Sequence, residues 1–466
     1  MADKKIILGF IILQIAICFP VLNQFPIALD EPFSIFHSQQ PLHTFWKIFE
    51  DGNNAPLHFI LLHGWIKLFG ISAIAVRSLS LVINLVSIIF LYKLGRKFWS
   101  QSYTGLLIGL FIFSRLDHFV AMEARMYGLF TLFFILILYD SYQLLFEEKR
   151  VYLLLGTWNA LLLYSHYLGG AILLMELLIF VFYYRLWTPK KLKYVLISIL
   201  ISLLLYLPNI ALLLSRSNDF KKNGTWVDVP EWTDLWTVLV KLMNNQVTFF
   251  MTVLLLVGLY LLRERKEHSP LGKEVSYFTV WFIGTYMMFY LISVFVQPVF
   301  IIKYVQFLTI PLFLILVGLA ERYKPSPKLR FIPFLMCIPF ALSFKYIPDV
   351  NREPDQLVAY VLSLKKDNTT VYYCPSHYNN TLAYHYDLIL FQNYDNMINL
   401  MEKDGFVAIQ SGEDVNVNLT EFIYIDFESE LLYPNNNILS TMNEGFVFEE
   451  LREFKGGFTV NYFKKR

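Results

Sequence analysis

The apolar residues of this chain fall into runs of about twenty, and this pattern restricts the possible folds more than any other feature of the sequence. A run of that length forms a helix that can cross roughly 30 Å of hydrocarbon. Charged residues make up only 16% of the 466 residues, against roughly 25% in a typical soluble domain. We therefore predict an α-helical polytopic membrane protein. The eleven expected spans cover residues 6–23, 74–94, 104–121, 127–146, 151–165, 168–184, 193–214, 246–262, 275–296, 304–320 and 331–346.

The Lys and Arg residues of the short loops predict the orientation of these spans, because cytoplasmic loops carry an excess of basic residues. With a cytoplasmic N-terminus, every basic cluster between spans falls on the cytoplasmic side. The first span follows Lys4 and Lys5, and no small-residue cleavage site comes after it, which favours an uncleaved first helix over a signal peptide.

Residues 347–466 differ from the rest of the chain, since they carry 18 Asp and Glu against 9 Lys and Arg. Strand-like runs appear at 371–374, 406–409 and 422–425, and a hairpin is expected around Gly456-Gly457. We predict a soluble extracytoplasmic α/β domain at 347–466 behind a transmembrane module at 1–346. Two outer segments of that module, 24–73 and 215–245, mix aromatic and polar residues in the manner of interfacial helices.

Several function classes are excluded at this stage. Three cysteines cannot form a disulfide scaffold, and a net charge of +2 lacks the basic surplus of a nucleic-acid binder. The sequence has no Walker loop, no dinucleotide-binding glycine fingerprint and no Gly-x-Ser-x-Gly elbow.

Two adjacent carboxylates, Asp30 and Glu31, follow the first expected span and precede Pro32. A charge at membrane depth is costly, so something usually compensates it. A carboxylate there can act as a general base or bind a cation. The same residues also suit a helix start, with Asp30 as N-cap and Pro32 in the first turn. Both interpretations stay open on pattern alone.

The segment from Glu123 to Tyr127 lies at the outer start of the fourth expected span. Arg125 can hold a phosphate with two parallel hydrogen bonds while Glu123 orients its guanidinium. The alternative is an interfacial Arg that pairs with Glu123 or Asp117 and anchors the helix.

Lys303 and Tyr304 occupy a similar position before the tenth expected span. A Lys ammonium is a suitable point charge for a phosphate, and a Tyr hydroxyl can donate a hydrogen bond to it. The alternative is a snorkelling Lys beside a Tyr of the aromatic belt.

The histidines do not predict a metal site. His58 and His63 are five residues apart and therefore lie off a common helix face. We expect no metal and no other cofactor, although the pattern does not exclude a divalent cation. Satisfied or substrate-contacting histidines are the preferred interpretation.

Taken together, these groups resemble the GT-C class of membrane glycosyltransferases, which includes the protein O-mannosyltransferases and the lipid A aminoarabinose transferase. The resemblance covers about residues 1–320. Relatives often have Arg-Tyr where this chain has Lys303-Tyr304, and His/Gly-x-Pro-Pro where it has Asn54-Ala55-Pro56. The resemblance is carried by Asp30-Glu31, Asn54-Ala55-Pro56-Leu57-His58 with His63, Leu68-Phe69-Gly70, Val76-Arg77-Ser78-Leu79, Tyr92-Lys93-Leu94-Gly95-Arg96, Glu123-Ala124-Arg125-Met126-Tyr127-Gly128-Leu129 and Tyr164-Ser165-His166-Tyr167.

The resemblance implies a sugar donor linked to a polyprenyl or dolichyl phosphate, and transfer to an extracytoplasmic acceptor hydroxyl with inversion. Asp30, with Glu31 beside it, then matches the catalytic acidic position. The residues assigned to the donor phosphate are Arg125, Lys303 and Tyr304, and those assigned to the surrounding cavity are Glu123, Tyr127, His58 and His166.

The expected partners are the lipid-linked donor, the bilayer and a glycan, lipid or protein acceptor, without nucleic acid. The abundance of Lys, Ile, Asn, Tyr and Phe in the sequence is typical of a bacterium with a low-GC genome. The expected location is therefore a bacterial inner membrane rather than the endoplasmic reticulum. Two alternatives stay open: a transporter or flippase of lipid-linked saccharides, and a polymerase or ligase of surface polysaccharide.

Overall fold

The structure is a computed structural model that describes residues 2–44, 55–212, 227–263, 272–323, 329–348, 352–433 and 435–466. Two compact units are present. The helical unit comprises Met1–Leu22, Thr44–Leu61 and Arg77–Pro348, and the α/β unit comprises Asn23–His43, Leu62–Val76 and Asp349–Arg466. The α/β unit thus includes segments 23–43 and 62–76, which the sequence division had placed with the transmembrane module. Residues 45–54 and 215–226 of the expected interfacial loops lie outside the described residues, as do residues 213–214 at the end of the seventh expected span.

Six described helices are long and apolar enough to cross a membrane. Two bent helix pairs raise this number to eight if each pair is a single span. Gly169–Phe182 and Ile332–Ser343 are shorter apolar helices, so the expected count of eleven stays a prediction. The six long helices are Asp3–Val21, Ala73–Phe98, Tyr127–Glu147, Pro189–Leu212, Lys273–Phe295 and Ile302–Arg322.

The two bent pairs each contain a new helix start. Helix α6 (Gln101–Ile112) is followed by α7 (Arg115–Met122) at 64°, where the Ser114 side chain accepts a hydrogen bond from the Asp117 amide. Helix α13 (Trp232–Leu242) meets α14 (Gln246–Leu262) at 75°, and Asn245 caps α14 through the Thr248 amide. Because a side-chain cap satisfies amides that have no intrahelical partner, each cap stabilises the helix that begins after the break.

Helix α8 (Tyr127–Glu147) forms the centre of the helical unit, since 89% of the residues in its 18-residue apolar stretch are buried. Its Phe134 ring contacts Trp281 of α15 (Lys273–Phe295) and Phe307. Helices α9 (Tyr152–Ser165) and α10 (Gly169–Phe182) separate at His166, which agrees with two helices rather than one long one.

Helix α9 also packs closely on α11 (Pro189–Tyr206) at Gly156, where a Cβ would meet the Ser198 carbonyl oxygen at 2.6 Å. Ser202 donates a hydrogen bond to the Gly156 carbonyl over 3.1 Å. A larger side chain at position 156 would therefore force these two helices apart.

The helical unit also contains the following α-helices. They are α1 (Ala2–Cys18), α4 (Pro56–Phe69), which continues into the α/β unit, α5 (Ala73–Phe98), α16 (Ile302–Val305), α17 (Thr309–Arg322) and α18 (Cys337–Ser343).

The α/β unit contains one five-stranded sheet of order β2-β1-β3-β5-β4. Strand β1 (Thr370–Cys374) pairs in parallel with β2 (Phe406–Ala408) and β3 (Glu421–Phe427). The hairpin of β4 (Phe446–Phe454) and β5 (Phe458–Lys465) adds to β3 antiparallel. The predicted strands, the hairpin and the small α/β fold are confirmed.

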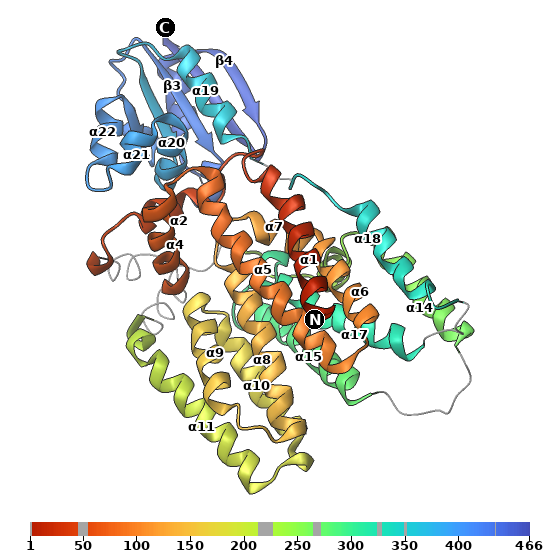
Figure 1. Cartoon of the computed structure of the whole chain (residues 1–466). Coiled ribbons are helices and arrows are strands. Elements are labelled where there is room, and N and C mark those ends of the chain that lie inside the picture. Colours follow the sequence, from red (N-terminus) through yellow and green to blue (C-terminus); the bar gives the residue numbers. More distant parts are fainter. Residues whose placement is uncertain are drawn as a thin grey trace. The chain divides into compact units, whose positions relative to one another are not determined.

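Helices lie beside this sheet (Figure 1), and segments 23–43 and 62–76 belong to the same unit. Helix α2 (Glu31–Ser38) packs on α20 (Asn379–Tyr386). The Phe36 ring stacks on Tyr394 with centroids 4.6 Å apart, and Tyr384 donates a hydrogen bond to the Ile71 carbonyl over 3.1 Å. Figure 1 also shows α19 (Pro354–Leu364), α21 (Leu388–Gln392) and α22 (Met397–Lys403) beside the sheet.

Candidate functional site

A non-helical turn between α7 and α8 carries the predicted Glu-Ala-Arg segment. Ser80 donates a hydrogen bond to the Glu123 carbonyl over 2.6 Å, and the Arg125 amide contacts the same oxygen at 2.7 Å. His58 of α4 binds the Ala124 carbonyl through Nε2 at 3.1 Å. The turn is thus held from two other helices, and the Glu123 and Arg125 side chains are both buried.

The His58 hydrogen bond defines the tautomer of that imidazole. A carbonyl oxygen only accepts, so Nε2 carries the hydrogen. Burial is the main cause that lowers the pKa of His58 to about 3, and the nearby Arg125 lowers it further. His58 is therefore a neutral donor that holds the turn.

Aromatic rings and cations meet at the N-terminal end of α8. Lys303 Nζ lies 5.5 Å from the centroid of the Tyr127 ring, a cation–π distance. The His166 ring contacts Tyr304 and Tyr127 with centroid distances of 5.4 Å and 6.1 Å. Burial, together with the charges of Arg125 and Lys303, lowers the pKa of His166. These predicted residues therefore share one site, which we call the cation–aromatic cluster (Arg125, Tyr127, His166, Lys303 and Tyr304).

A small cavity opens within this cluster. The His166 Nδ1 accepts a hydrogen bond from the Leu168 amide over 3.1 Å, which leaves Nε2 as the nitrogen that carries hydrogen. Gln306 donates from Nε2 to Thr131 Oγ1 over 3.2 Å. The cavity is lined by Tyr127, Phe130, His166, Leu168, Tyr304, Gln306 and Phe307.

The predicted catalytic carboxylates lie in the α/β unit. Asp30 occupies the N-cap position of α2 and Pro32 lies in its first turn, but the Asp30 side chain makes no capping hydrogen bond. The Glu31 side chain is buried, and its Oε2 accepts a hydrogen bond from the Ala28 amide at 3.5 Å. Asp30 thus stands at the start of the helix, as the helix-start interpretation predicts, but its carboxylate does not cap the helix.

Sequence reasoning missed several polar groups. Gln306 lies in an apolar run. The only sequence signal for a polar role at this position is that a single amide side chain stands among hydrophobic neighbours. Two buried acids, Asp140 and Glu176, lie in the middle of expected spans, where isolated acids are a recognised signal. Trp158 donates to Asp140 over 2.9 Å and Asn159 to Glu176 over 2.7 Å.

The described part of the chain contains no group of three or more His, Cys, Asp and Glu side chains arranged to hold a metal. His58 and His166 each use one ring nitrogen for a backbone group. Independence from metals stays a prediction.

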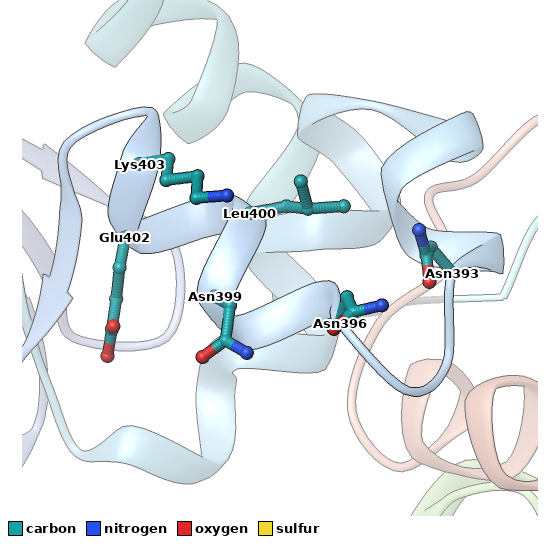
Figure 2. A pocket seen from close by; sticks show the side chains of 6 residues that line it. All are labelled: Asn393, Asn396, Asn399, Leu400, Glu402 and Lys403. Atoms are coloured by element: carbon teal, nitrogen blue, oxygen red, sulfur yellow. The ribbon is translucent and has the colours of Figure 1, made fainter.

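A separate polar hollow lies on α22 and the segment before it. Figure 2 shows Asn399 and Glu402 extending to the same side of this helix. The hollow contains none of the predicted site residues. It is lined by Asn393, Asn396, Asn399, Leu400, Glu402 and Lys403.

Comparison with known proteins gives a family match over part of the chain and a similar fold. Residues 53–211 match the family described as dolichyl-phosphate-mannose-protein mannosyltransferase. This range includes His58, the Glu123–Tyr127 segment and His166. Among curated proteins no significant relative was found.

The fold is similar to that of ArnT from Cupriavidus metallidurans. The crystal structure of ArnT bound to undecaprenyl phosphate matches with a TM-score of 0.61 and 10% identity, over 98% of this chain and 97% of that one. The apo structure matches with a TM-score of 0.64 and 10% identity, over 99% and 98%. The chain therefore has an ArnT-like fold, and this fold together with the family match confirms the predicted resemblance.

Proposed function

We propose that this protein is a membrane glycosyltransferase that takes a sugar from a lipid-phosphate donor and transfers it to an acceptor hydroxyl. The observation that carries the proposal is the cation–aromatic cluster, in which Lys303, Tyr127 and His166 meet at the outer end of α8. The family match and the ArnT-like fold support the same activity.

The donor phosphate is assigned to Arg125 and Lys303. The planar Arg fork can make two parallel hydrogen bonds to a phosphate, and the Lys ammonium adds a mobile charge. Both cations are near His166, whose lowered pKa keeps it from adding a third charge at neutral pH. When the sugar leaves, the phosphate gains negative charge, and fixed cations stabilise it most at that point.

Asp30 is assigned as the general base, with Glu31 as the buried residue that supports its turn. The Asp30 carboxylate removes the proton from the acceptor hydroxyl while that oxygen forms a bond to the anomeric carbon. The bond from this carbon to the phosphate oxygen breaks, and its electron pair stays on the phosphate. A single displacement of this kind inverts the anomeric centre.

The proposed setting is the outer face of a bacterial inner membrane, with a cytoplasmic N-terminus. The acceptor is a hydroxyl of a glycan, lipid or protein. ArnT in the similar structure binds undecaprenyl phosphate, and this lipid is the first donor carrier to test.

The test uses the full-length protein in proteoliposomes with its host membrane lipids and radiolabelled undecaprenyl-phosphate pentoses and hexoses. Wild type should release undecaprenyl monophosphate and label an acceptor. Asp30→Asn should lose at least about 100-fold in rate, the range of general base catalysis. The matched control is Asp367→Asn, which removes an exposed carboxylate of the same unit and should transfer at the wild-type rate.

Other outcomes identify the alternatives. Movement of the labelled lipid across sealed vesicles without a covalent product would indicate a transporter. Release of a diphosphate lipid would indicate a polymerase or ligase. Full activity of Asp30→Asn would remove Asp30 from the role of base.

A further inference from the structure

The loop between α8 and α9 and the loop between α10 and α11 are joined into one surface, which we call the basic rim (residues 147–152 and 182–194). Thr188 Oγ1 donates a hydrogen bond to Glu148 Oε1 over 3.3 Å, and Lys190 Nζ lies 3.8 Å from the same oxygen. Lys191 Nζ donates to the Leu145 carbonyl over 2.8 Å. The last turn of α8 is therefore tied to the first turn of α11.

An aromatic pair joins the same two loops. The Tyr152 ring at the start of α9 stacks on Tyr194 of α11, with centroids 4.8 Å apart and planes 28° apart. Arg150 comes two residues before Tyr152, and Lys193 comes directly before Tyr194. The stacked rings therefore bring together the two segments that carry these cations.

The basic rim lies at the opposite end of these helices from the cation–aromatic cluster. Helix α8 runs from Tyr127 of that cluster to Glu147 at the rim, and α9 and α10 separate at His166 at the cluster end. The predicted orientation places the rim on the cytoplasmic side. It is therefore a separate surface, to which the proposed function assigns no role.

The acids of the basic rim are already neutralised by lysines. Glu147 pairs with Lys97 and, at 3.0 Å, with Lys149 Nζ. Glu148 pairs with Lys190. Both carboxylates are thus balanced, and they leave no negative charge for the other cations of the rim.

Three cations of the basic rim have no acidic partner. Arg150, Arg185 and Lys193 are all exposed, and no carboxylate among the described residues lies within ion-pair distance of them. Arg185 makes only a 3.4 Å contact from its Nε to the neighbouring Tyr184 hydroxyl. Their positive charges are therefore available to an anion from outside the chain.

An exposed apolar row begins beside these cations. Leu192, Leu196 and Leu200 share one face of α11, because residues four apart lie above one another on a helix. Only 33% of the residues in the apolar stretch of this span are buried. Phe182 and Tyr184 are exposed at the rim, as is typical of the aromatic belt at headgroup level. Charge, aromatic rings and leucines thus follow one another from the rim into the membrane.

We propose that the basic rim binds an anionic glycerophospholipid of the adjacent leaflet. Arg150, Arg185 and Lys193 hold its phosphodiester, and its acyl chains lie along the leucine row of α11. This inference does not depend on the proposed transfer activity.

Charge complementarity selects this ligand. A guanidinium can donate two parallel hydrogen bonds to phosphate oxygens, and an ammonium adds a point charge. Basic clusters at the ends of spans attract anionic headgroups in this way. A soluble anion would satisfy the cations but leave the leucine row without a partner. A zwitterionic lipid carries its own cation, which the rim repels.

The test uses the full chain in nanodiscs that contain equal amounts of phosphatidylglycerol and phosphatidylcholine, and native mass spectrometry identifies the lipids that stay bound. Wild type should retain phosphatidylglycerol at least about 10-fold over phosphatidylcholine, since each cation near an anionic headgroup contributes a factor of about five. The variant Arg150→Gln/Arg185→Gln/Lys193→Gln should retain the two lipids almost equally. Equal retention by wild type would overturn the proposal.

A matched control is needed because basic residues also set the orientation of spans without binding any lipid. Lys4, Lys5 and Lys93 are exposed residues of α1 and α5 on the same predicted side of the membrane. Lys4→Gln/Lys5→Gln/Lys93→Gln removes the same number of charges and should keep the wild-type preference for phosphatidylglycerol. If it loses as much of this preference as the rim variant does, the effect belongs to net charge and the proposal is wrong.

A measurement on wild type alone covers the case in which the rim variant does not insert. Raising ammonium acetate from about 0.1 M to about 1 M shortens the Debye length from about 10 Å to about 3 Å. The preference for phosphatidylglycerol should then fall at least about 3-fold, because the three cations are exposed and their attraction is screened. A preference that does not change with salt would contradict the proposed charge recognition.

Competing anions identify the occupant of the rim. Phosphatidylglycerol should stay bound when inorganic phosphate is added at constant ionic strength. It should also stay bound when undecaprenyl phosphate is added at a concentration well below its own. Displacement by inorganic phosphate would indicate a site for a soluble anion, and displacement by so little undecaprenyl phosphate would indicate a site for a donor carrier. Either result would overturn the assignment to a glycerophospholipid.

Discussion

His58 Nε2 lies 3.1 Å from the Ala124 carbonyl oxygen, and this contact ties α4 to the turn that carries Glu123 and Arg125. Ser80 holds the neighbouring Glu123 carbonyl over 2.6 Å. The Arg125 guanidinium is therefore presented from a turn whose backbone oxygens are fixed on both sides. Such support holds in place the Arg that we propose binds the donor phosphate, without itself contacting the phosphate.

This contact makes His58 a positioning residue with a testable signature. His58→Ala removes the donor to the buried Ala124 carbonyl, and an unsatisfied buried acceptor costs about 1–3 kcal/mol. We expect lower thermal stability in detergent and at least about a 10-fold lower transfer rate. His58→Gln keeps an N–H donor at similar reach and should recover most of both. Equal losses in the two variants would contradict the positioning role.

The pH dependence of stability follows from the same group. The folded pKa of His58 is about 3 against an ordinary value of 6.5, so the unfolded chain binds a proton that the folded chain excludes. His58 therefore stabilises the fold fully above pH 6.5, and this contribution falls by about 1.4 kcal/mol per pH unit below it. Thermal unfolding measures this dependence. Wild type should lose stability relative to both His58→Gln and His58→Ala between pH 6.5 and 5. The difference in stability between these two variants should stay constant with pH, because neither has a titrating group at position 58.

The second prediction concerns the Lys303 ammonium. Lys303→Met should raise the KM of the lipid-phosphate donor about 10-fold or more, because one hydrogen-bonded charge contributes roughly 1.5–3 kcal/mol. Lys303→Arg keeps the charge and should retain most of the affinity. The measurement is donor-dependent transfer in proteoliposomes.

A matched control is available for this experiment. Lys93 also lies over an aromatic ring, with Nζ 4.8 Å from the Phe90 centroid, but at the predicted cytoplasmic end of α5. Lys93→Met should leave the donor KM unchanged. A similar rise in KM for both Met variants would show a general effect on membrane insertion rather than phosphate binding.

Local signals predicted most of the helices and strands. The apolar run at 127–146 became α8, and the run at 371–374 became β1, because spans and short strands follow from the periodicity of neighbouring residues. The start of α2 at Glu31 likewise follows from Asp30 and Pro32. The expected span at 104–121 is divided in the structure, because the Ser114 side chain caps a new helix, α7, after α6 ends.

Contacts between residues that are far apart in the chain could not be predicted from the sequence. The stacking of Phe36 on Tyr394 joins residues that are more than 300 positions apart, and no local pattern indicates that α2 belongs with the α/β unit. The cation–aromatic cluster was predicted in its members but not in its contacts.

The third prediction concerns the buried pair of Asn159 and Glu176. Asn159 Nδ2 donates to Glu176 Oε2 over 2.7 Å between α9 and α10. Glu176→Leu leaves this amide without its partner and should lower the free energy of unfolding by about 0.6–1.7 kcal/mol. Glu176→Gln keeps the acceptor and should be close to wild type. The double variant Asn159→Leu/Glu176→Leu should recover part of the loss, and a strictly additive loss would show that the pair is not coupled.

The last prediction concerns Gly456 in the β4–β5 turn. Its φ of +91° disfavours any other residue, and an added Cβ would meet Arg352 at 2.3 Å. Gly456→Ala should therefore destabilise the protein by about 1–3 kcal/mol and displace Arg352 from its position 5.0 Å from the Phe458 ring centroid. The control is Gly445→Ala, since no atom lies within 4 Å of its added Cβ and the residue ends α24 (Ile438–Gly445). That variant should be neutral or slightly stabilising. Thermal unfolding measures both, and a Gly456→Ala protein as stable as wild type would show that Arg352 does not depend on the turn.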